Sequence, residues 1–206
     1  AREHVQKAYD LAQQLKYLPG MAQAVLGMGI IEYTIGNDTL ARKKFRQCMA
    51  LSTQIKDEHL KAYALAFIGL TYQNVDQLDS AEACYTSAYK ILKDSLNSDH
   101  LSFLYLAQAK LYESKNNPSL QLSYLKRSWE IRKRMNDKRL LTNAGKELVV
   151  YYTERSEYKK SISILDEIQS ALGKDTVDSE EITRVNKERA IIYADLGNYR
   201  ASLSLF

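Results

Sequence analysis

The stretch LAFIGLTYQNVDQLDSAEACYTSA, residues 65–88, decides the fold of this chain of 206 residues. Within it, the small residues Gly69 and Ala81 alternate with the aromatic residues Tyr72 and Tyr85. A small residue on each of two helices lets their axes approach closely where they cross, and a bulky neighbour fills the space beside the crossing. Polar residues that favour a turn separate the two apolar runs. The stretch therefore predicts two short antiparallel helices.

The same spacing recurs about every forty residues along the chain. Gly29, Gly69, Ala109 and Ala190 occupy one small-residue slot, and Val149 departs from it in the fourth copy. The slot that fills the space between pairs holds large residues, namely Phe45, Tyr85, Leu125 and Leu165. Internal repeats of this length build solenoids, so we expect five consecutive helix pairs.

The spacing of residues 65–88 resembles that of the tetratricopeptide repeat (TPR) family, and this resemblance covers essentially the whole chain. The long period resembles the repeats of kinesin light chains and of bacterial TPR-containing sensor and regulator proteins, since the standard repeat has about 34 residues. The resemblance implies an all-α, right-handed α-solenoid (superhelix) of antiparallel TPR-like helix pairs.

The resemblance also implies a function. It favours a non-enzymatic protein- or peptide-binding or sensing module, in the repeat region of a larger bacterial protein of regulation or signal transduction, such as a transcriptional regulator. The alternative is an architectural spacer or oligomerisation segment with no groove ligand. TPR units serve many partners, and the fold alone does not choose between these two.

The repeat register predicts a single TPR-like solenoid over residues 1–206. Residues 1–19 are expected to be the second helix of a preceding repeat, and the five repeats follow at 20–57, 58–97, 98–137, 138–174 and 179–206. The last repeat is incomplete, with Phe206 in an aromatic slot. Because the register begins and stops inside a repeat, we expect a fragment of a longer chain.

Turn and capping residues support these divisions. Residues that tolerate a break stand between the helices of each pair, at Gly36, Asp76, Asn116, Ser156 and Gly197. Between one pair and the next, a side chain suited to capping precedes the incoming helix, at Asp57, Ser98 and Asp137.

Composition and motifs favour binding over catalysis. The formal charge of +4 implies no specific nucleic-acid binding, and no apolar run approaches the length that membrane insertion needs. The sequence has no nucleophile, phosphate-loop or zinc motif, so no catalytic residue, cofactor or metal is expected. Cys48 and Cys84 lie in helical patterns and are expected to be buried structural thiols. Neither they nor the N-terminus distinguishes a cytoplasmic from a periplasmic location.

The first helices of the repeats are expected to line a concave groove for a protein or peptide partner. Positions that the packing slots leave free predict its wall: Tyr33, Phe67, Leu70, Gln73, Asn74, Lys110, Glu113, Lys146, Glu147 and Lys187. The first two repeats offer aromatic and apolar surface, and the later ones offer charge, which suits a ligand with an apolar end and a charged end. Phe67 and Leu70 have an equally good reading as packing residues. A homo-oligomer is compatible with the same surfaces.

A basic run lies between Lys126 and Arg139. It is read as a solvated outer face, with a docking patch for an acidic partner or nucleic acid as the alternative.

Overall fold

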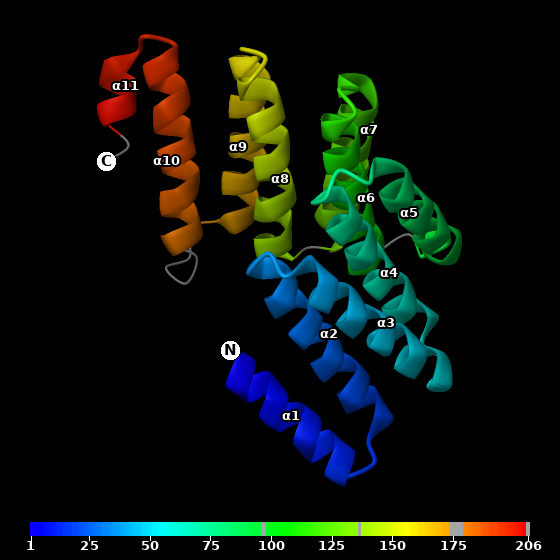
Figure 1. Ribbon diagram of the computed structural model, residues 1–206. Coiled ribbons are helices and arrows are strands. Elements are labelled where there is room, and N and C mark those ends of the chain that lie inside the picture. Colours follow the sequence, from blue (N-terminus) through cyan, green and yellow to red (C-terminus); the bar gives the residue numbers. More distant parts are fainter. Residues whose placement is uncertain (96–97, 136, 174–178, 205–206) are drawn as a thin grey trace. The chain divides into compact units, whose positions relative to one another are not determined.

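The computed structural model describes residues 1–95, 98–135, 137–173 and 179–204, and all regular structure in these ranges is helical. Figure 1 shows the helices, α1 (Arg2–Gln14), α2 (Leu18–Thr34), α3 (Asp38–Gln54), α4 (Glu58–Gln73), α5 (Leu78–Leu92), α6 (Asp99–Ser114), α7 (Pro118–Met135), α8 (Lys138–Thr153), α9 (Tyr158–Leu172), α10 (Ser179–Asp195) and α11 (Tyr199–Leu203). The all-α prediction is confirmed. The slot predicted for Phe206 lies outside the described residues.

The chain forms two compact units, residues 1–121 and 122–206, which are described separately. In the first unit each helix from α1 to α5 packs against the next helix along the chain, and α4 also packs against α2 and α6. The helices α2, α4 and α6 therefore lie beside one another, and α1, α3 and α5 cover them as a second layer. In the second unit α9 packs between α8 and α10, and α11 folds back on α10.

The predicted helix crossings are present in the first unit. A Cβ atom added to Gly69 would lie 2.4 Å from Cε1 of Tyr85, and one added to Gly29 would lie 2.5 Å from Cε1 of Phe45. Both aromatic side chains are fully buried. The absence of a side chain on each glycine thus makes room for the ring of the second helix, as the repeat spacing predicts.

The fourth repeat achieves its close approach at a different residue. A Cβ atom added to Gly145, one turn before Val149 on α8, would lie 2.6 Å from Cδ1 of Ile168 and 2.7 Å from Cζ3 of Trp129. Ser161 Oγ still donates to the carbonyl oxygen of Val149 at 3.3 Å, so α8 and α9 also meet at the predicted slot.

The predicted caps and turns are also confirmed. The side chains of Asp57 and Asp137 each accept a hydrogen bond at 2.9 Å from the backbone N–H three residues later, and Ser98 accepts one at 3.4 Å. The five predicted turn residues all have positive φ angles, between 52° and 79°. Such angles end a helix sharply.

The two cysteines differ in burial. Cys48 is fully buried, and burial raises the pKa of its thiol to about 11. Cys84 is half-buried, and burial raises its pKa as well. Both shifts keep the thiols protonated near neutral pH, which fits a packing role for Cys48.

Candidate functional site

An aromatic cluster joins the three first helices of the first unit. It consists of Tyr33 on α2, Tyr63 and Phe67 on α4, and Phe103 on α6. The ring of Phe67 lies at its centre, with centroids 6.1 Å from Tyr33, 5.1 Å from Tyr63 and 4.7 Å from Phe103. Tyr63 and Phe103 also contact each other at 4.8 Å. Phe67 is buried and the other three are half-buried, so the cluster presents a partly exposed aromatic surface.

Two histidines extend this aromatic cluster at the N-terminal ends of α4 and α6. The ring of His100 stacks on Tyr63 with centroids 4.4 Å apart, and His59 lies 6.5 Å from His100. Nε2 of His59 is 3.3 Å from Oγ of Ser95. The imidazoles therefore add polar edges to an otherwise apolar surface.

Two of the predicted groove residues are core residues instead. Phe67 is 6% exposed and Leu70 is 8% exposed. Phe67 stacks on the buried Phe45 of α3, at a centroid distance of 5.0 Å. Both side chains are buried, so the structure favours their packing interpretation over the groove interpretation, and Phe67 contacts the second layer through Phe45.

Two further predicted groove residues are engaged within the protein. The side-chain oxygen of Gln73 accepts a hydrogen bond from the Tyr85 hydroxyl at 3.1 Å, and its amide donates to Ser114 at 3.3 Å. The amide of Asn74 donates to Asp38 at 3.0 Å. These amides link helices rather than offering free hydrogen-bonding groups.

The remaining predicted residues fall in two places. Lys110 and Glu113 are exposed on α6 in the first unit. In the second unit Lys146 and Glu147 are half-buried on α8, and Lys187 is exposed on α10. The structure thus brings Tyr33 and Phe67 together, while the single groove through all five repeats stays a prediction.

Sequence reasoning missed Tyr63 and Phe103. A signal was available, because they stand forty residues apart at the same position of successive first helices. Lys110 follows Phe103 by seven residues, about two helical turns, so both lie on one face of α6. That face of α6 therefore carries the aromatic ring of Phe103 and, two turns further on, the charge of Lys110.

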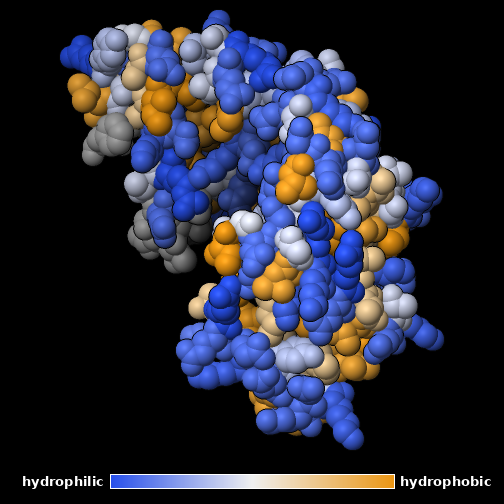
Figure 2. All heavy atoms as spheres, viewed as in Figure 1, coloured by the Kyte–Doolittle hydropathy of each residue, from blue (hydrophilic) through white to orange (hydrophobic). Residues whose placement is uncertain are grey.

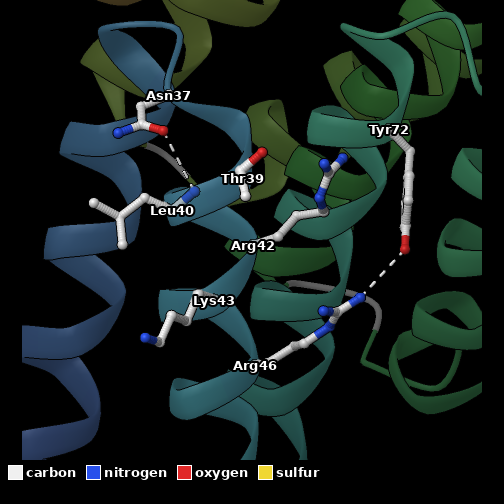
Figure 3. A pocket seen from close by; sticks show the side chains of 7 residues that line it. All are labelled: Asn37, Thr39, Leu40, Arg42, Lys43, Arg46 and Tyr72. Atoms are coloured by element: carbon white, nitrogen blue, oxygen red, sulfur yellow. Dashed lines mark hydrogen bonds between the residues drawn. The ribbon is translucent and has the colours of Figure 1, made fainter.

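A basic hollow lies in the first unit between α3, a helix of the second layer, and Tyr72 of α4 (Figure 3). Its volume is about 620 Å³, and it is lined by Asn37, Thr39, Leu40, Arg42, Lys43, Arg46 and Tyr72. In Figure 3 the side chains of Arg42 and Arg46 extend from α3 toward Tyr72 of α4, whereas Lys43 extends away from Tyr72. None of these described lining residues carries a carboxylate.

Tyr72 holds both guanidinium groups of this hollow. Arg42 lies 4.9 Å above the Tyr72 ring and donates to the carbonyl oxygen of Thr71 at 3.3 Å. Arg46 donates to the Tyr72 hydroxyl at 3.3 Å. These contacts orient the two cations without neutralising them.

The second repeat carries an acidic arrangement at the equivalent place. Glu82 of α5 accepts hydrogen bonds from the Tyr112 hydroxyl at 2.8 Å and from Lys115 Nζ at 2.5 Å. Asp79 lies 3.5 Å from the same ammonium group. The hydrogen bond from Lys115, followed by that from Tyr112, lowers the pKa of the Glu82 carboxyl.

Glu82→Gln is expected to remove a small acid-sensitive part of the stability. Because the folded pKa of Glu82 lies below its ordinary value of 4.5, its contribution is present above that value and is lost as the pH falls through the folded pKa. The Glu82 and Lys115 side chains are 39% and 26% exposed, so the contribution should be below about 1 kcal/mol. Thermal melts of both proteins from about pH 3 to about pH 7 measure it. A difference in melting temperature that stays constant with pH would contradict this assignment.

The second unit has a smaller hollow of about 150 Å³ between α7, α8 and α9, lined by Trp129, Lys133, Lys138, Leu141, Glu167 and Ala171. Part of the basic run is used structurally here. Lys133 pairs with Glu167 at 2.7 Å, and Lys138 donates to the carbonyl oxygen of Leu172 at 2.9 Å. Arg132 is 4% exposed, so the reading of the whole run as a solvated face is wrong at that position.

Neither a metal-binding cluster nor a membrane-spanning helix is found in the part of the chain that the structure describes. No three His, Cys, Asp or Glu side chains there gather to hold a metal ion. None of its helices combines the length and apolar character of a membrane span. On the face seen in Figure 2, hydrophilic side chains cover most of the first unit, and hydrophobic ones lie in small groups between them.

No protein-family model matches the sequence, and no curated protein matches it. Solved structures do match the fold. BtubC from P. vanneervenii has a TM-score of 0.76 at 13% identity, over 99% of this chain and 86% of BtubC. A Podosopora anserina protein with nearly identical TPR-like repeats, regarded as a kinesin light chain, has a TM-score of 0.68 at 13% identity, over 89% of this chain and 90% of its own. RapI in its apo form has a TM-score of 0.63 at 15% identity, over 99% of this chain and 72% of RapI.

These similarities, together with the helix crossings at Gly29 and Gly69, define the class of the fold. The chain is an all-α array of antiparallel TPR-like helix pairs, and its helix pairs have the solenoid arrangement of TPR-repeat proteins.

Proposed function

We propose that this chain is a non-enzymatic module that binds a protein or peptide partner, and that an apolar segment of the partner contacts the aromatic cluster of α2, α4 and α6. The observation that carries the proposal is the partial exposure of Tyr33, Tyr63 and Phe103 around the buried Phe67. Rigid aromatic side chains supply much of the binding energy in protein interfaces at little cost in conformational entropy.

The surroundings of the aromatic cluster support a partner with a mixed surface. His59 and His100 border it at one end, and the exposed Lys110 and Glu113 continue the same layer along α6. Such a surface suits an apolar anchor followed by charged or polar residues. An extended peptide or one face of a helix would meet these requirements.

A selection of displayed random peptides against the folded chain, followed by affinity measurement of the selected peptides, tests the proposal. Tyr63→Ala and Phe103→Ala should each weaken binding by about tenfold or more, because truncating a central aromatic residue removes a dominant contact. Circular dichroism should show unchanged helicity in both variants.

Tyr199→Ala is the matched control, because Tyr199 is 67% exposed and belongs to the second unit. Its affinity should equal that of the unaltered chain. Unchanged affinity in the folded Tyr63→Ala and Phe103→Ala variants would contradict the proposal. Failure to select any peptide would favour the alternative of an architectural spacer or oligomerisation segment.

The regulatory setting is a further part of the proposal. The long repeat period resembles that of bacterial sensor and regulator proteins, so we propose that the module serves a larger protein of signal transduction or transcriptional regulation. The complete gene tests this part: a kinase or helix-turn-helix domain in the same reading frame is expected, and a reading frame without any such domain would contradict it.

A further inference from the structure

We propose that the basic hollow on α3 binds a carboxylate group from an acidic segment of a partner protein. This site is separate from the aromatic cluster. Tyr72, in the hollow, and Tyr63, in the cluster, are nine residues apart on α4, which places them about 180° apart around the helix axis. The two surfaces can therefore be tested independently, and failure at one leaves the other standing.

The first argument is the uncompensated charge. Arg42, Lys43 and Arg46 form no ion pair with any residue that the structure describes. Arg42 and Arg46 are one helical turn apart on α3, a spacing at which like charges destabilise a helix. The nearest acid on that row, Asp38, instead accepts a hydrogen bond from Asn74. An anion in the hollow would relieve this repulsion.

The second argument is that contacts within the protein already orient the two guanidinium groups before any ligand binds. Arg42 is fixed by the Thr71 carbonyl oxygen and the face of the Tyr72 ring, and Arg46 by the Tyr72 hydroxyl. That hydroxyl accepts from Arg46, so its own hydrogen can be donated to a further acceptor. Oriented donors lose less entropy on binding, and charged donors form stronger hydrogen bonds with a carboxylate.

The third argument comes from the next repeat of the same chain. A shift of forty residues turns Arg42 into Glu82, Tyr72 into Tyr112 and Val75 into Lys115. There the tyrosine hydroxyl and the ammonium group both hold the Glu82 carboxylate. The second repeat therefore supplies its own carboxylate to the tyrosine, whereas the first repeat supplies cations and leaves the carboxylate to a partner.

The chemistry favours an acidic protein segment over a nucleic acid. A nucleic acid requires a basic surface that follows its backbone, and the net charge of the whole chain is only +4. The hollow offers a compact set of donors around one tyrosine hydroxyl, and the group held at the equivalent place is a carboxylate.

Fluorescence anisotropy with labelled octaglutamate tests the inference at low ionic strength, with octaglutamine as the uncharged probe. Octaglutamate should bind, and added salt should weaken the binding because exposed charges are screened. Octaglutamine should not bind. Equal binding of the two probes would overturn the proposal, as would tighter binding of an oligothymidylate than of octaglutamate.

Variants of the hollow locate the binding. Arg42→Gln with Arg46→Gln should weaken octaglutamate binding by about tenfold or more, because it removes two charged donors. Lys90→Gln with Lys93→Gln removes the same charge from exposed positions at the end of α5, and should change the affinity by less than about twofold. Equal losses in the two pairs would overturn the proposal, since general electrostatics would then explain the binding. Arg46→Gln alone, at an exposed position, gives the same comparison if the pair fails to fold.

A rebuilt hollow provides the sharpest measurement. Arg42→Glu with Val75→Lys copies the Glu82 and Lys115 arrangement into the first repeat, and lowers the net charge by only one. It should abolish octaglutamate binding, because the internal carboxylate occupies Tyr72, while the melting temperature is maintained. Retained octaglutamate binding in this folded variant would overturn the proposal.

Discussion

Phe67→Ala is expected to lower the free energy of unfolding by about 3–5 kcal/mol, the usual cost of removing a buried aromatic ring. The Phe67 ring is only 6% exposed and contacts Phe45, Tyr33, Tyr63 and Phe103. Truncation leaves a cavity at the junction of three first helices, where the helices cannot close around it without losing their other contacts.

Urea denaturation followed by circular dichroism measures this effect. Phe67→Leu is the control, because it keeps apolar volume at the site and should cost less than Phe67→Ala. A cost for Phe67→Ala below about 1 kcal/mol would mean that Phe67 lies on a surface, as a groove residue would. The result also determines how binding is tested: Phe67 variants would confuse unfolding with loss of affinity, whereas Tyr63 and Phe103 variants would not.

Gly69→Leu should destabilise the chain by about 1–3 kcal/mol through overpacking. Even a Cβ atom at this position would lie 2.4 Å from Cε1 and 2.8 Å from Cδ1 of Tyr85. The Tyr85 ring is fully buried, and its hydroxyl is bound to Gln73, so it has little freedom to move away. α4 and α5 would have to separate.

Thermal melting of Gly69→Leu measures the effect. Gly36→Leu is not a suitable control, because the positive φ angle of Gly36 would itself be strained by a side chain. Gly69→Leu combined with Tyr85→Ala is the informative comparison. The second substitution removes the ring that the leucine meets, so the double variant should lose less stability than the two separate losses summed. Simple additivity would show that the leucine clashes elsewhere.

The fold could be predicted from the sequence because its signals are local. Gly69, Tyr85 and the cap at Asp57 each act within one helix pair, and a repeat at forty residues presents the same evidence several times. Dependence on the repeat spacing also explains why the role of Gly145 in the fourth repeat was not predicted. Gly145 sits one turn away from the expected slot, and only the contacts with Ile168 and Trp129 reveal its role.

The candidate sites could be predicted only in part, because they depend on contacts between repeats. Phe67 and Tyr63 are both aromatic residues of α4 and stand four positions apart. The sequence of α4 alone does not show which of the two side chains is buried by residues of α2 and α6. The basic hollow was not foreseen, since Arg42 and Arg46 look like ordinary surface residues until Tyr72 is placed beside them.

The aromatic cluster bears on how the first unit unfolds. A solenoid in which each repeat touches only its neighbour can lose its repeats one at a time. Here Phe67 of the second repeat is in direct ring contact with Tyr33 of the first and Phe103 of the third. Loss of α2 or α6 exposes one side of this ring, so the stability of each neighbouring first helix is coupled to that of α4. The half-buried aromatic surface is thereby held in place by contacts among three helices rather than by any single helix.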